Sequence, residues 1–482
     1  NQPNSPSGSM HAAVFALLLP NALAFRTASF RGVGTALRPE LCLLKRCALP
    51  QFSEASPKLT ADETSPPVTS VPSAPLAAGA HGDVTIPGWL AKLSHLEELG
   101  FGSVTLLSAT ALSLSLANFG PTRTAWLAFW QLPLGPAIGG HVLSVKGWVN
   151  EGLMAVFFFL VGLEIKQELR LGSLASIRKA VLPCIAAFGG MVTPMLVYLA
   201  VQSMSACGSL AAMTVPMATD IAFAMAIFGF FRTRMPAASS AFLLTLATVD
   251  DLGAIIVLAV CFSAHVVPSF LAASAAVTGG LTLFGRQRTS NLPLFAIGGA
   301  LLWFCLLSAG VNADIAGVIT GLTVSTQAAC DNREGVRESF AERMIAWLSP
   351  LSCFFIMPVF ALANTAVSLS GGVAQASFAP AAGIGAGLLL GKPLGIFCFT
   401  VLACKLGVAS LPSGMTKRHV GIAGILGGIG FTMCLLLTEV SLPVSLQTLP
   451  KLAVLVSSGI AAVVGAICMR MLPELNSKAA AA

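Results

Sequence analysis

Two neighbouring aspartates, Asp250 and Asp251, lie within the apolar run LLTLATVDDLGAIIVLAV. The run has the length and composition of a membrane-spanning helix, where a charged carboxylate costs at least roughly 2.5 to 3.5 kcal/mol. Neighbouring carboxylates in a low-dielectric site resist joint ionisation, so at least one of them is expected to hold either a proton or a cation. Competition between a proton and a cation for one site is the minimal chemistry of a cation/proton exchanger.

A third carboxylate, Asp220, lies in the apolar run VPMATDIAFAMAIFGFF, where Pro216 interrupts the helical pattern just before Thr219 and Asp220. Broken helices are tolerated in a membrane only where their free backbone groups face protein or a water-filled cavity, and ions bind at the ends of such half-helices. The segment GILGGIGFTM, residues 424–433, carries a matching interruption. Two such segments indicate an inverted-repeat transporter, although close helix packing alone would also explain the glycines.

One lysine, Lys392, lies within the apolar segment GLLLGKPLGIFCF. An unpaired buried charge is strongly unfavourable, so an intramembrane carboxylate is expected to be its partner, with Asp250 or Asp251 the first choice. The alternative is a lysine that extends its ammonium group to the membrane surface. The position of Lys392 near the middle of its span disfavours that alternative.

These residues lie in a chain of 482 residues that is 55% hydrophobic and 10% charged, which indicates a polytopic membrane protein with membrane lipid as its surroundings. Because a span needs about 20 predominantly apolar residues, we predict an all-α fold of about twelve transmembrane helices, with spans 4 and 11 interrupted. The expected spans are 101–119, 148–169, 180–201, 210–231, 237–262, 266–285, 291–308, 312–326, 345–370, 380–404, 419–440 and 451–470.

The net charge of +7 reflects orientation in the membrane rather than binding of nucleic acid. Basic residues collect in alternate connections, which by the positive-inside rule places both termini on the cytoplasm-equivalent side. These residues are Lys166, Arg170, Arg178, Lys179, Arg232, Arg234, Arg286, Arg288, Arg333, Arg337, Arg343, Lys405, Lys417, Arg418, Arg470 and Lys478.

No constellation typical of a conventional enzyme or a resident metal is present in the sequence. Most of the twelve cysteines are scattered through apolar spans, none forms a C-x-x-C pair, and no histidine has metal-ligand spacing. We therefore expect a protein that is not an enzyme and needs no cofactor beyond the ions it transports.

The first 85 residues differ from the rest. Residues 10–25 form a short apolar stretch that ends in Ala22-Leu23-Ala24, as a secretory signal does, and an acid-poor, arginine-bearing stretch that resembles a transit peptide follows Phe25. Together they resemble the bipartite presequences of plastids of secondary, red-algal origin; the alternative is a disordered tail. We expect residues 1–85 to hold this presequence and a linker rich in Ser and Pro, residues 86–472 the membrane domain, and residues 473–482 a short tail.

The segment between the first two spans, residues 131–147, has a Gly-rich turn and strand-like alternation. It predicts either an exposed hairpin or an irregular loop. A hairpin edge would be able to pair with a second copy of the chain, which makes a homodimer through this segment an expectation.

Eight motifs in order resemble the NhaA-type sodium/proton antiporters over roughly residues 90–470. They are VFFFLVGLEIKQEL, GSLASIRKA, PMATDIAFAMA, LATVDDLGAIIV, SAGVNADIAGVI, MPVFALANTAVSL, LLLGKPLGI and GILGGIGFTM. The repeat prediction is not independent of this resemblance, since the family is a known example of inverted repeats.

The resemblance implies a role for each matching residue. Asp251 would be the principal carboxylate for Na⁺ and H⁺, Asp250 would pair with Lys392, and Thr219 and Asp220 would line the crossing of the broken helices, with Na⁺ at Asp251 and Asp220. Glu164 and Glu168 would match positions implicated in the response to pH. An ordinary cluster of interfacial charges is the equal alternative for these two glutamates.

The chain departs from the family before the eighth span, where Asn312 replaces the histidine of many members and Asp314 replaces a smaller polar residue. Histidine is the side chain whose ordinary pKa spans physiological pH, so its absence puts the usual pH sensitivity in doubt. Asn312 can cap the following helix and Asp314 can complement its dipole. A regulatory role for Asp314 is the competing hypothesis.

The sequence therefore predicts an electrogenic antiporter that exchanges Na⁺ or Li⁺ for H⁺ and serves pH and sodium homeostasis. The alternatives are an inverted-repeat symporter of an organic anion and a membrane sensor that transports nothing.

Overall fold

The computed structural model describes residues 88–98, 100–138, 141–205, 209–262, 267–287, 291–326, 339–369 and 377–474, which all belong to one compact unit. The presequence and linker expected at 1–85 lie outside the described residues, as does the tail expected at 473–482 apart from its first two residues.

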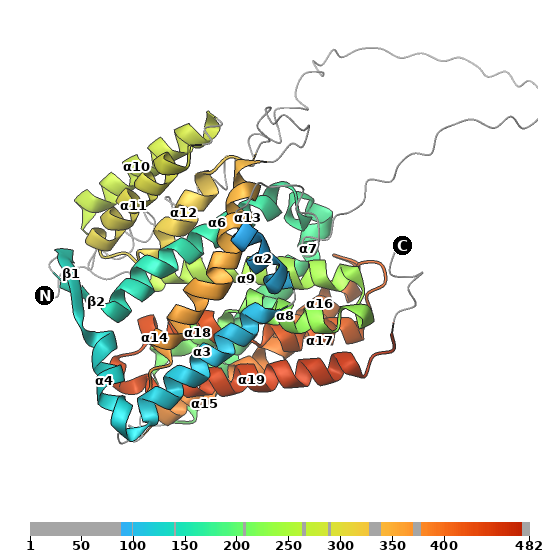
Figure 1. Cartoon of the computed structure of the whole chain (residues 1–482). Coiled ribbons are helices and arrows are strands. Elements are labelled where there is room, and N and C mark those ends of the chain that lie inside the picture. Colours follow the sequence, from blue (N-terminus) through green and yellow to red (C-terminus); the bar gives the residue numbers. More distant parts are fainter. Residues whose placement is uncertain are drawn as a thin grey trace, which may run out of the picture. The chain divides into compact units, whose positions relative to one another are not determined.

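The regular secondary structure of the described residues is helical except for one β hairpin, which confirms the all-α prediction (Figure 1). Helices dominate because a long apolar run inside a membrane satisfies its own backbone hydrogen bonds in that conformation. The α-helices are α2 (Gly88–Glu98), α3 (Phe101–Asn118), α4 (Gly120–Gln131), α5 (Val145–Gly147), α6 (Met154–Arg170), α7 (Ile177–Ser203), α8 (Ile221–Phe230), α9 (Ala237–Cys261), α10 (Pro268–Arg286), α11 (Leu292–Ala309), α12 (Asp314–Thr323), α13 (Phe340–Leu351), α14 (Met357–Asn364), α15 (Phe378–Ala386), α16 (Lys392–Lys405), α17 (Lys417–Gly427), α18 (Phe431–Ser441) and α19 (Thr448–Arg470).

Shorter helical segments of other pitch connect or interrupt these helices. The π-helical segments are η1 (Trp148–Leu153), η5 (Ser352–Ile356) and η7 (Gly387–Gly391), and the 3-10 segments are η2 (Ser173–Ala175), η3 (Leu210–Met217), η4 (Arg232–Arg234) and η8 (Val444–Leu446). Each π segment joins two α-helices into one longer span.

Among the described residues, ten helical stretches are long and apolar enough to cross a membrane, and one bent pair of helices adds an eleventh. The prediction of a full span at 312–326 is wrong in its length, because α12 has ten residues. At 1.5 Å rise per residue it extends about 15 Å, roughly half of the hydrocarbon core. The carbonyls of Leu322 and Val324 at its C-terminal end accept hydrogen bonds from the Lys166 ammonium, so these carbonyl groups have a partner within the protein.

Both predicted interruptions are confirmed. The first span of the pair changes from η3 to α8 through the extended residues Ala218 to Asp220. The second is broken between α17 and α18, which are bent by 45° at residues 428–430. Some backbone N–H and C=O groups at both breaks, residues 218–220 and 428–430, therefore lack partners within their own helices. The two breaks face each other.

Small residues allow two helix pairs to approach closely. A Cβ added to Gly317 of α12 would lie 2.0 Å from the carbonyl oxygen of Ala155 in α6, and one added to Gly395 of α16 would lie 2.2 Å from that of Gly189 in α7. Close approach through glycine is the common mode of helix packing in membranes. These two contacts fix α6 against α12 and α16 against α7.

The arrangement places α9 in the interior, in contact with α6, α7, α8, α17 and η3. Figure 1 shows α10, α11 and α12 side by side at one edge and α16, α17 and α19 at another. Because α9 is surrounded, any ionisable side chain near its middle must find its partners among its neighbours.

The segment between the first two spans forms a hairpin of β1 (Pro133–Ile138) and β2 (His141–Ser144), so the hairpin alternative is confirmed. The strands are antiparallel, with Pro133 opposite Ser144 and Ile138 opposite His141, and an irregularity lies between Pro133 and Ala137. The Trp148 indole donates to the carbonyl of Leu134 at 2.7 Å, which attaches the hairpin to η1.

Candidate ion and proton site

Asp250 on α9 is fully buried and holds two hydrogen-bond donors on one oxygen. Its Oδ2 accepts from the Lys392 ammonium at 2.6 Å and from the Thr219 hydroxyl at 2.7 Å. Thr219 Oγ1 also lies 3.0 Å from the carbonyl oxygen of Gly427, so its single proton serves one acceptor at a time. The ammonium balances the charge of this carboxylate, while its Oδ1 is buried and has no hydrogen-bond partner among the described residues.

Lys392 reaches Asp250 from the start of α16, directly after the π-helical segment η7. Both side chains are inaccessible to solvent, so the ammonium does not extend to the membrane surface. Lys392 also donates to the backbone carbonyl of Met217, the last residue of η3. Of the two predicted partners, the lysine therefore pairs with Asp250, and it satisfies one free carbonyl of the first broken span as well.

Asp220 connects the two broken spans. Its Oδ1 accepts the backbone N–H of Phe223 at 3.0 Å and thereby caps α8. Its Oδ2 accepts both the backbone N–H of Thr432 at 3.1 Å and the Thr432 hydroxyl at 2.6 Å, at the start of α18. The backbone N–H of Asp220 donates to the carbonyl of Ile429 at 2.7 Å. One carboxylate therefore lies at the positive ends of two helices, where negative charge is favoured.

Asp251, beside Asp250 on α9, is 2% exposed. Its Oδ1 is buried and accepts no hydrogen bond from any residue that the structure describes. Three other carboxylates, those of Asp250, Asp220 and Glu164, repel a charge on Asp251, and the Lys392 ammonium partly offsets that repulsion. The centre thus holds more buried carboxylates than cations, and it can accept a proton or a small cation at Asp251.

The two predicted pH-response glutamates have different surroundings. Glu164 is part-buried on α6 and lies near enough to Asp251 to repel it. Glu168, one turn further on, is buried, and its Oε1 accepts from the Thr245 hydroxyl at 3.0 Å and from the backbone N–H of Ser173 at 2.8 Å. The structure therefore places Glu164 close to the centre and uses Glu168 to hold α6 against α9 and η2.

Asp314 lies apart from this centre, at the first residue of α12. The side chain of Asn312 accepts the backbone N–H of Asp314 at 3.0 Å, in a turn that precedes α12. The N-cap position itself is Ala313, so Asn312 does not occupy the predicted capping position. Asp314 itself faces a separate cavity, described below.

Three participants were missed by sequence reasoning. They are the Thr432 side chain and the backbone carbonyls of Gly427 and Met217. Thr432 follows directly on the second helix break, as Thr219 and Asp220 follow on the first, and that parallel was an available signal. Carbonyl groups carry no signal in side-chain identity.

Comparison with known sequences agrees with this arrangement. The family model described as "Na+/H+ antiporter 1" matches residues 94–469. The chain is 38% identical to the Na(+)/H(+) antiporter NhaA of Mesorhizobium japonicum over 381 residues, which cover 78% of this chain and 94% of the relative. It is 39% identical to NhaA of Pasteurella multocida over 383 residues, covering 77% and 98%, and 38% identical to NhaA of Haemophilus influenzae over 386 residues, covering 78% and 94%.

The matched region contains every helix from α3 to α18 and most of α19, and with it both broken spans and the buried Asp250–Lys392 pair. The chain is therefore an integral, multi-pass membrane protein that belongs to the NhaA-type family of Na⁺/H⁺ antiporters.

Proposed function

We propose that the protein is a secondary antiporter that exchanges Na⁺, or Li⁺, for H⁺ across its membrane, with Asp251 as the group for which the two ions compete. The observation that carries the proposal is the ion pair that Lys392 forms with Asp250 and not with the equally buried Asp251 beside it, whose Oδ1 is unpartnered among the described residues. A desolvated carboxylate oxygen without a donor is costly, and a proton or a cation removes that cost.

In the proposed cycle, ionised Asp251 binds Na⁺ from one side, with Asp220 contributing charge from the crossing. The ion remains bound while the helices that carry it move against the rest, and protonation of Asp251 on the other side releases it. Both carboxylate oxygens of Asp220 already accept hydrogen bonds from the starts of α8 and α18. Asp220 would therefore contact the ion only through lone pairs that these hydrogen bonds leave unused.

A second proton per cycle would make transport electrogenic. The Asp250–Lys392 pair is the candidate carrier, because one proton lies in the buried hydrogen bond between its two members and can leave from whichever member holds it when that bond breaks. Regulation by pH is proposed for Glu164, which lies near the centre. The relatives reported above are all named antiporters. They give no support to the two alternatives, an organic-anion symporter and a membrane sensor that transports nothing.

The test is reconstitution of the purified protein into liposomes with an imposed acidic interior that a pH-sensitive dye reports. Addition of Na⁺ or Li⁺ is expected to dissipate the gradient, and choline at equal ionic strength is expected to leave it intact. Asp251→Asn should behave as empty liposomes do, whereas Glu342→Gln, which removes a carboxylate from the capping box of α13, should exchange as the unmodified protein does. Na⁺-independent behaviour of the unmodified protein would overturn the proposal.

We also propose a homodimer through residues 131–147. The two-stranded hairpin has an unpaired edge on each side within the described residues, and such an edge can add strands from a second copy. Cross-linking of cysteines introduced at Leu134 in the membrane should give a dimer band, and cysteines at Leu283 on α10, which are equally exposed, should not.

The sequence at residues 1–85 supports a plastid address, and we propose that the transporter lies in an inner envelope or thylakoid membrane. The proposal rests on the signal-like stretch that ends at Ala24 and the transit-like stretch that follows Phe25.

A further inference from the structure

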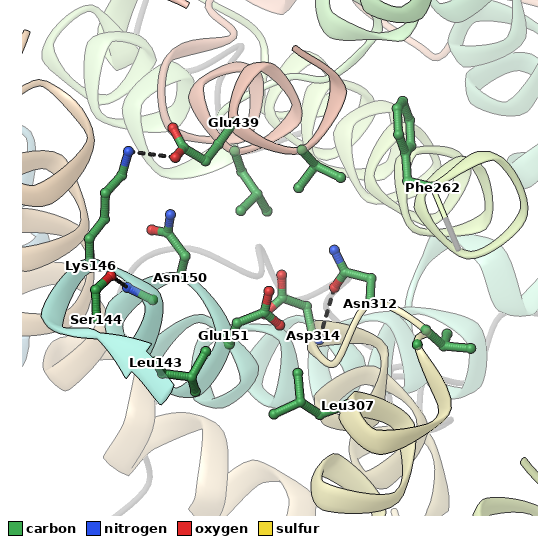
Figure 2. Close-up of a pocket in the computed structure, with 15 residues that line it drawn as sticks. Leu143, Ser144, Lys146, Asn150, Glu151, Phe262, Leu307, Asn312, Asp314 and Glu439 are labelled. Atoms are coloured by element: carbon green, nitrogen blue, oxygen red, sulfur yellow. Dashed lines mark hydrogen bonds and ion pairs between the residues drawn. The ribbon is translucent and has the colours of Figure 1, made fainter. Parts of the chain in front are cut away.

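A cavity of about 450 Å³ lies at the end of α6 that is remote from Lys166 and Arg170 (Figure 2). The hairpin, the start of the span 145–170, the N-terminus of α12 and the C-terminal ends of α9 and α18 surround it. It is distinct from the Asp251 centre, because Phe262 on its wall is about 16 Å along α9 from Asp251 at 1.5 Å rise per residue. By the distribution of basic loops, it opens on the face opposite the cytoplasm-equivalent side.

Several polar groups of the cavity wall already have partners. Glu439 accepts from Lys146 at 2.5 Å and from Lys451, which lies beside the wall. The amides of Asn150 and Asn364 hydrogen-bond to each other at 2.7 and 3.3 Å. These contacts give each of the five side chains a partner.

Two carboxylates on the same wall differ. Glu151 lies near the backbone N–H of Ala313, and its Oε2 is buried and has no hydrogen-bond partner among the described residues. Asp314 is 2% exposed, and its Oδ1 is likewise buried and without a partner there. Figure 2 shows the carboxylates of Glu151 and Asp314 pointing toward each other at the wall of the cavity. Negative charges on the two groups repel each other.

The charges around the cavity do not balance. Glu151, Asp314 and Glu439 contribute three carboxylates, while Lys146 and Lys451 contribute two ammonium groups. The N-terminus of α12 favours negative charge by a fraction of an elementary charge, which does not replace a full cation. With all three carboxylates ionised one positive charge is missing, and the two unpartnered oxygens belong to the carboxylates that lie together at this wall (Figure 2).

We propose that Glu151 and Asp314 hold one monovalent cation at a second site, on the outer side of the protein. The assignment of Na⁺ as that cation rests on the proposed function, because Na⁺ would reach or leave the Asp251 centre from this face. Carboxylate and water oxygens suit hard cations, and the cavity has room for waters that complete the coordination. A monovalent ion supplies the single missing positive charge, whereas a divalent ion would leave one positive charge in excess.

The experiment measures equilibrium binding of ²²Na⁺ to purified protein in which Asp251→Asn has removed the central site. This variant is expected to retain about one saturable Na⁺ site. Adding Asp314→Asn, or alternatively Glu151→Gln, should lower the affinity at least tenfold. Adding Glu342→Gln, the matched control on α13, should leave it unchanged. Monodisperse elution in gel filtration shows which variants are folded, and the two independent carboxylate changes keep the test decisive if one of them fails to fold.

Three outcomes would overturn the proposal. They are loss of all saturable Na⁺ binding in Asp251→Asn, undiminished binding after either added carboxylate change, and displacement of ²²Na⁺ by Ca²⁺ at lower concentration than by Na⁺. Failure of the antiport proposal would instead appear as absent Na⁺-driven proton movement in the unmodified protein, which is a separate measurement.

Discussion

Replacement of Lys392 by alanine tests whether the buried ion pair is needed for stability. The change removes the ammonium that donates to Asp250 and to the carbonyl of Met217, while the Thr219 hydroxyl remains as a donor to Asp250. Because both charged side chains are inaccessible to solvent, water cannot replace the lost donor without structural change.

The magnitude follows from these two contacts. Loss of one partner of a buried ion pair typically lowers the free energy of unfolding by roughly 3 to 5 kcal/mol, because a buried charge is left uncompensated. A second change, Asp250→Asn, removes that charge and should recover most of this loss. The carbonyl of Met217 still lacks its donor in the double variant, and a buried unsatisfied carbonyl costs about 1 to 3 kcal/mol. The double variant should therefore be more stable than Lys392→Ala and less stable than the unmodified protein.

The assay is unfolding of each detergent-solubilised variant by titration with a denaturing detergent, which gives differences in the free energy of unfolding. The matched control is Lys451→Ala, since Lys451 is also a buried lysine that pairs with a carboxylate. Its partner Glu439 keeps a second ammonium, that of Lys146, so the control should lose markedly less stability than Lys392→Ala.

The reasoning would be refuted if the losses of Asp250→Asn and Lys392→Ala simply add in the double variant. Residues that share a buried hydrogen bond are expected to show a coupling free energy of about 0.5 to 3 kcal/mol, and distant residues add within about 0.5 kcal/mol. Equal losses in Lys392→Ala and Lys451→Ala would also contradict the view that the number of remaining partners decides the cost.

The other predictions concern the ion centre and the cellular address. Asp251→Asn is expected to abolish Na⁺-dependent proton movement in liposomes, because an amide neither titrates at neutral pH nor offers a full negative charge; wild-type-like rates would exclude the mechanism. Asp220→Asn is expected to raise the apparent KM for Na⁺ several-fold and also to lower Tm, since one amide oxygen cannot replace two carboxylate oxygens that cap α8 and α18. Thr432→Ala keeps the charge of Asp220, so it should lower Tm with a smaller effect on KM; an unchanged KM in Asp220→Asn would remove Asp220 from the site. Residues 10–85 fused to a fluorescent protein should reach a complex plastid and Phe25→Ala should stop the fusion before final import, whereas secretion or cytosolic retention of the unmodified fusion would disprove the address.

The pairing of Lys392 with an aspartate of α9 was predictable from the sequence for an energetic reason. A charge in an apolar run requires a partner, and few opposite charges were available within the spans. The choice of Asp250 over Asp251 depended on which face of α9 points toward α16, and neighbouring residues on a helix point about 100° apart. The sequence therefore predicts that Lys392 pairs with an aspartate of α9. Which of the two aspartates it contacts depends on how the helices pack, and the sequence does not show that.

The contact between Glu151 and Asp314 was not predictable in this way. The two residues lie in spans that the sequence treats as independent, and the close approach of α6 and α12 through glycines brings them together. Glu151 gives no sequence signal for a binding site, because it is near the end of an apolar run, where an acidic residue is common. Asp314 was interpreted as a complement to the helix dipole, which explains its place at the N-terminus but not its unpartnered oxygen.

The number of donors that each buried carboxylate receives distinguishes its possible roles. Asp220 uses both oxygens to cap two helices, and Glu168 holds a loop and a neighbouring helix, so these two groups stabilise the fold whether or not an ion is bound. Asp250, Asp251, Glu151 and Asp314 each keep a buried oxygen without a donor among the described residues. Asp250 differs from the other three, because the Lys392 ammonium balances its charge. Such an oxygen lowers stability by about 1 to 3 kcal/mol, or more when it is charged, so a proton or a cation that binds there gains that free energy. The two sites with unpartnered oxygens are therefore where ion binding and conformation can be coupled most strongly, one in the middle of the protein and one at its outer face.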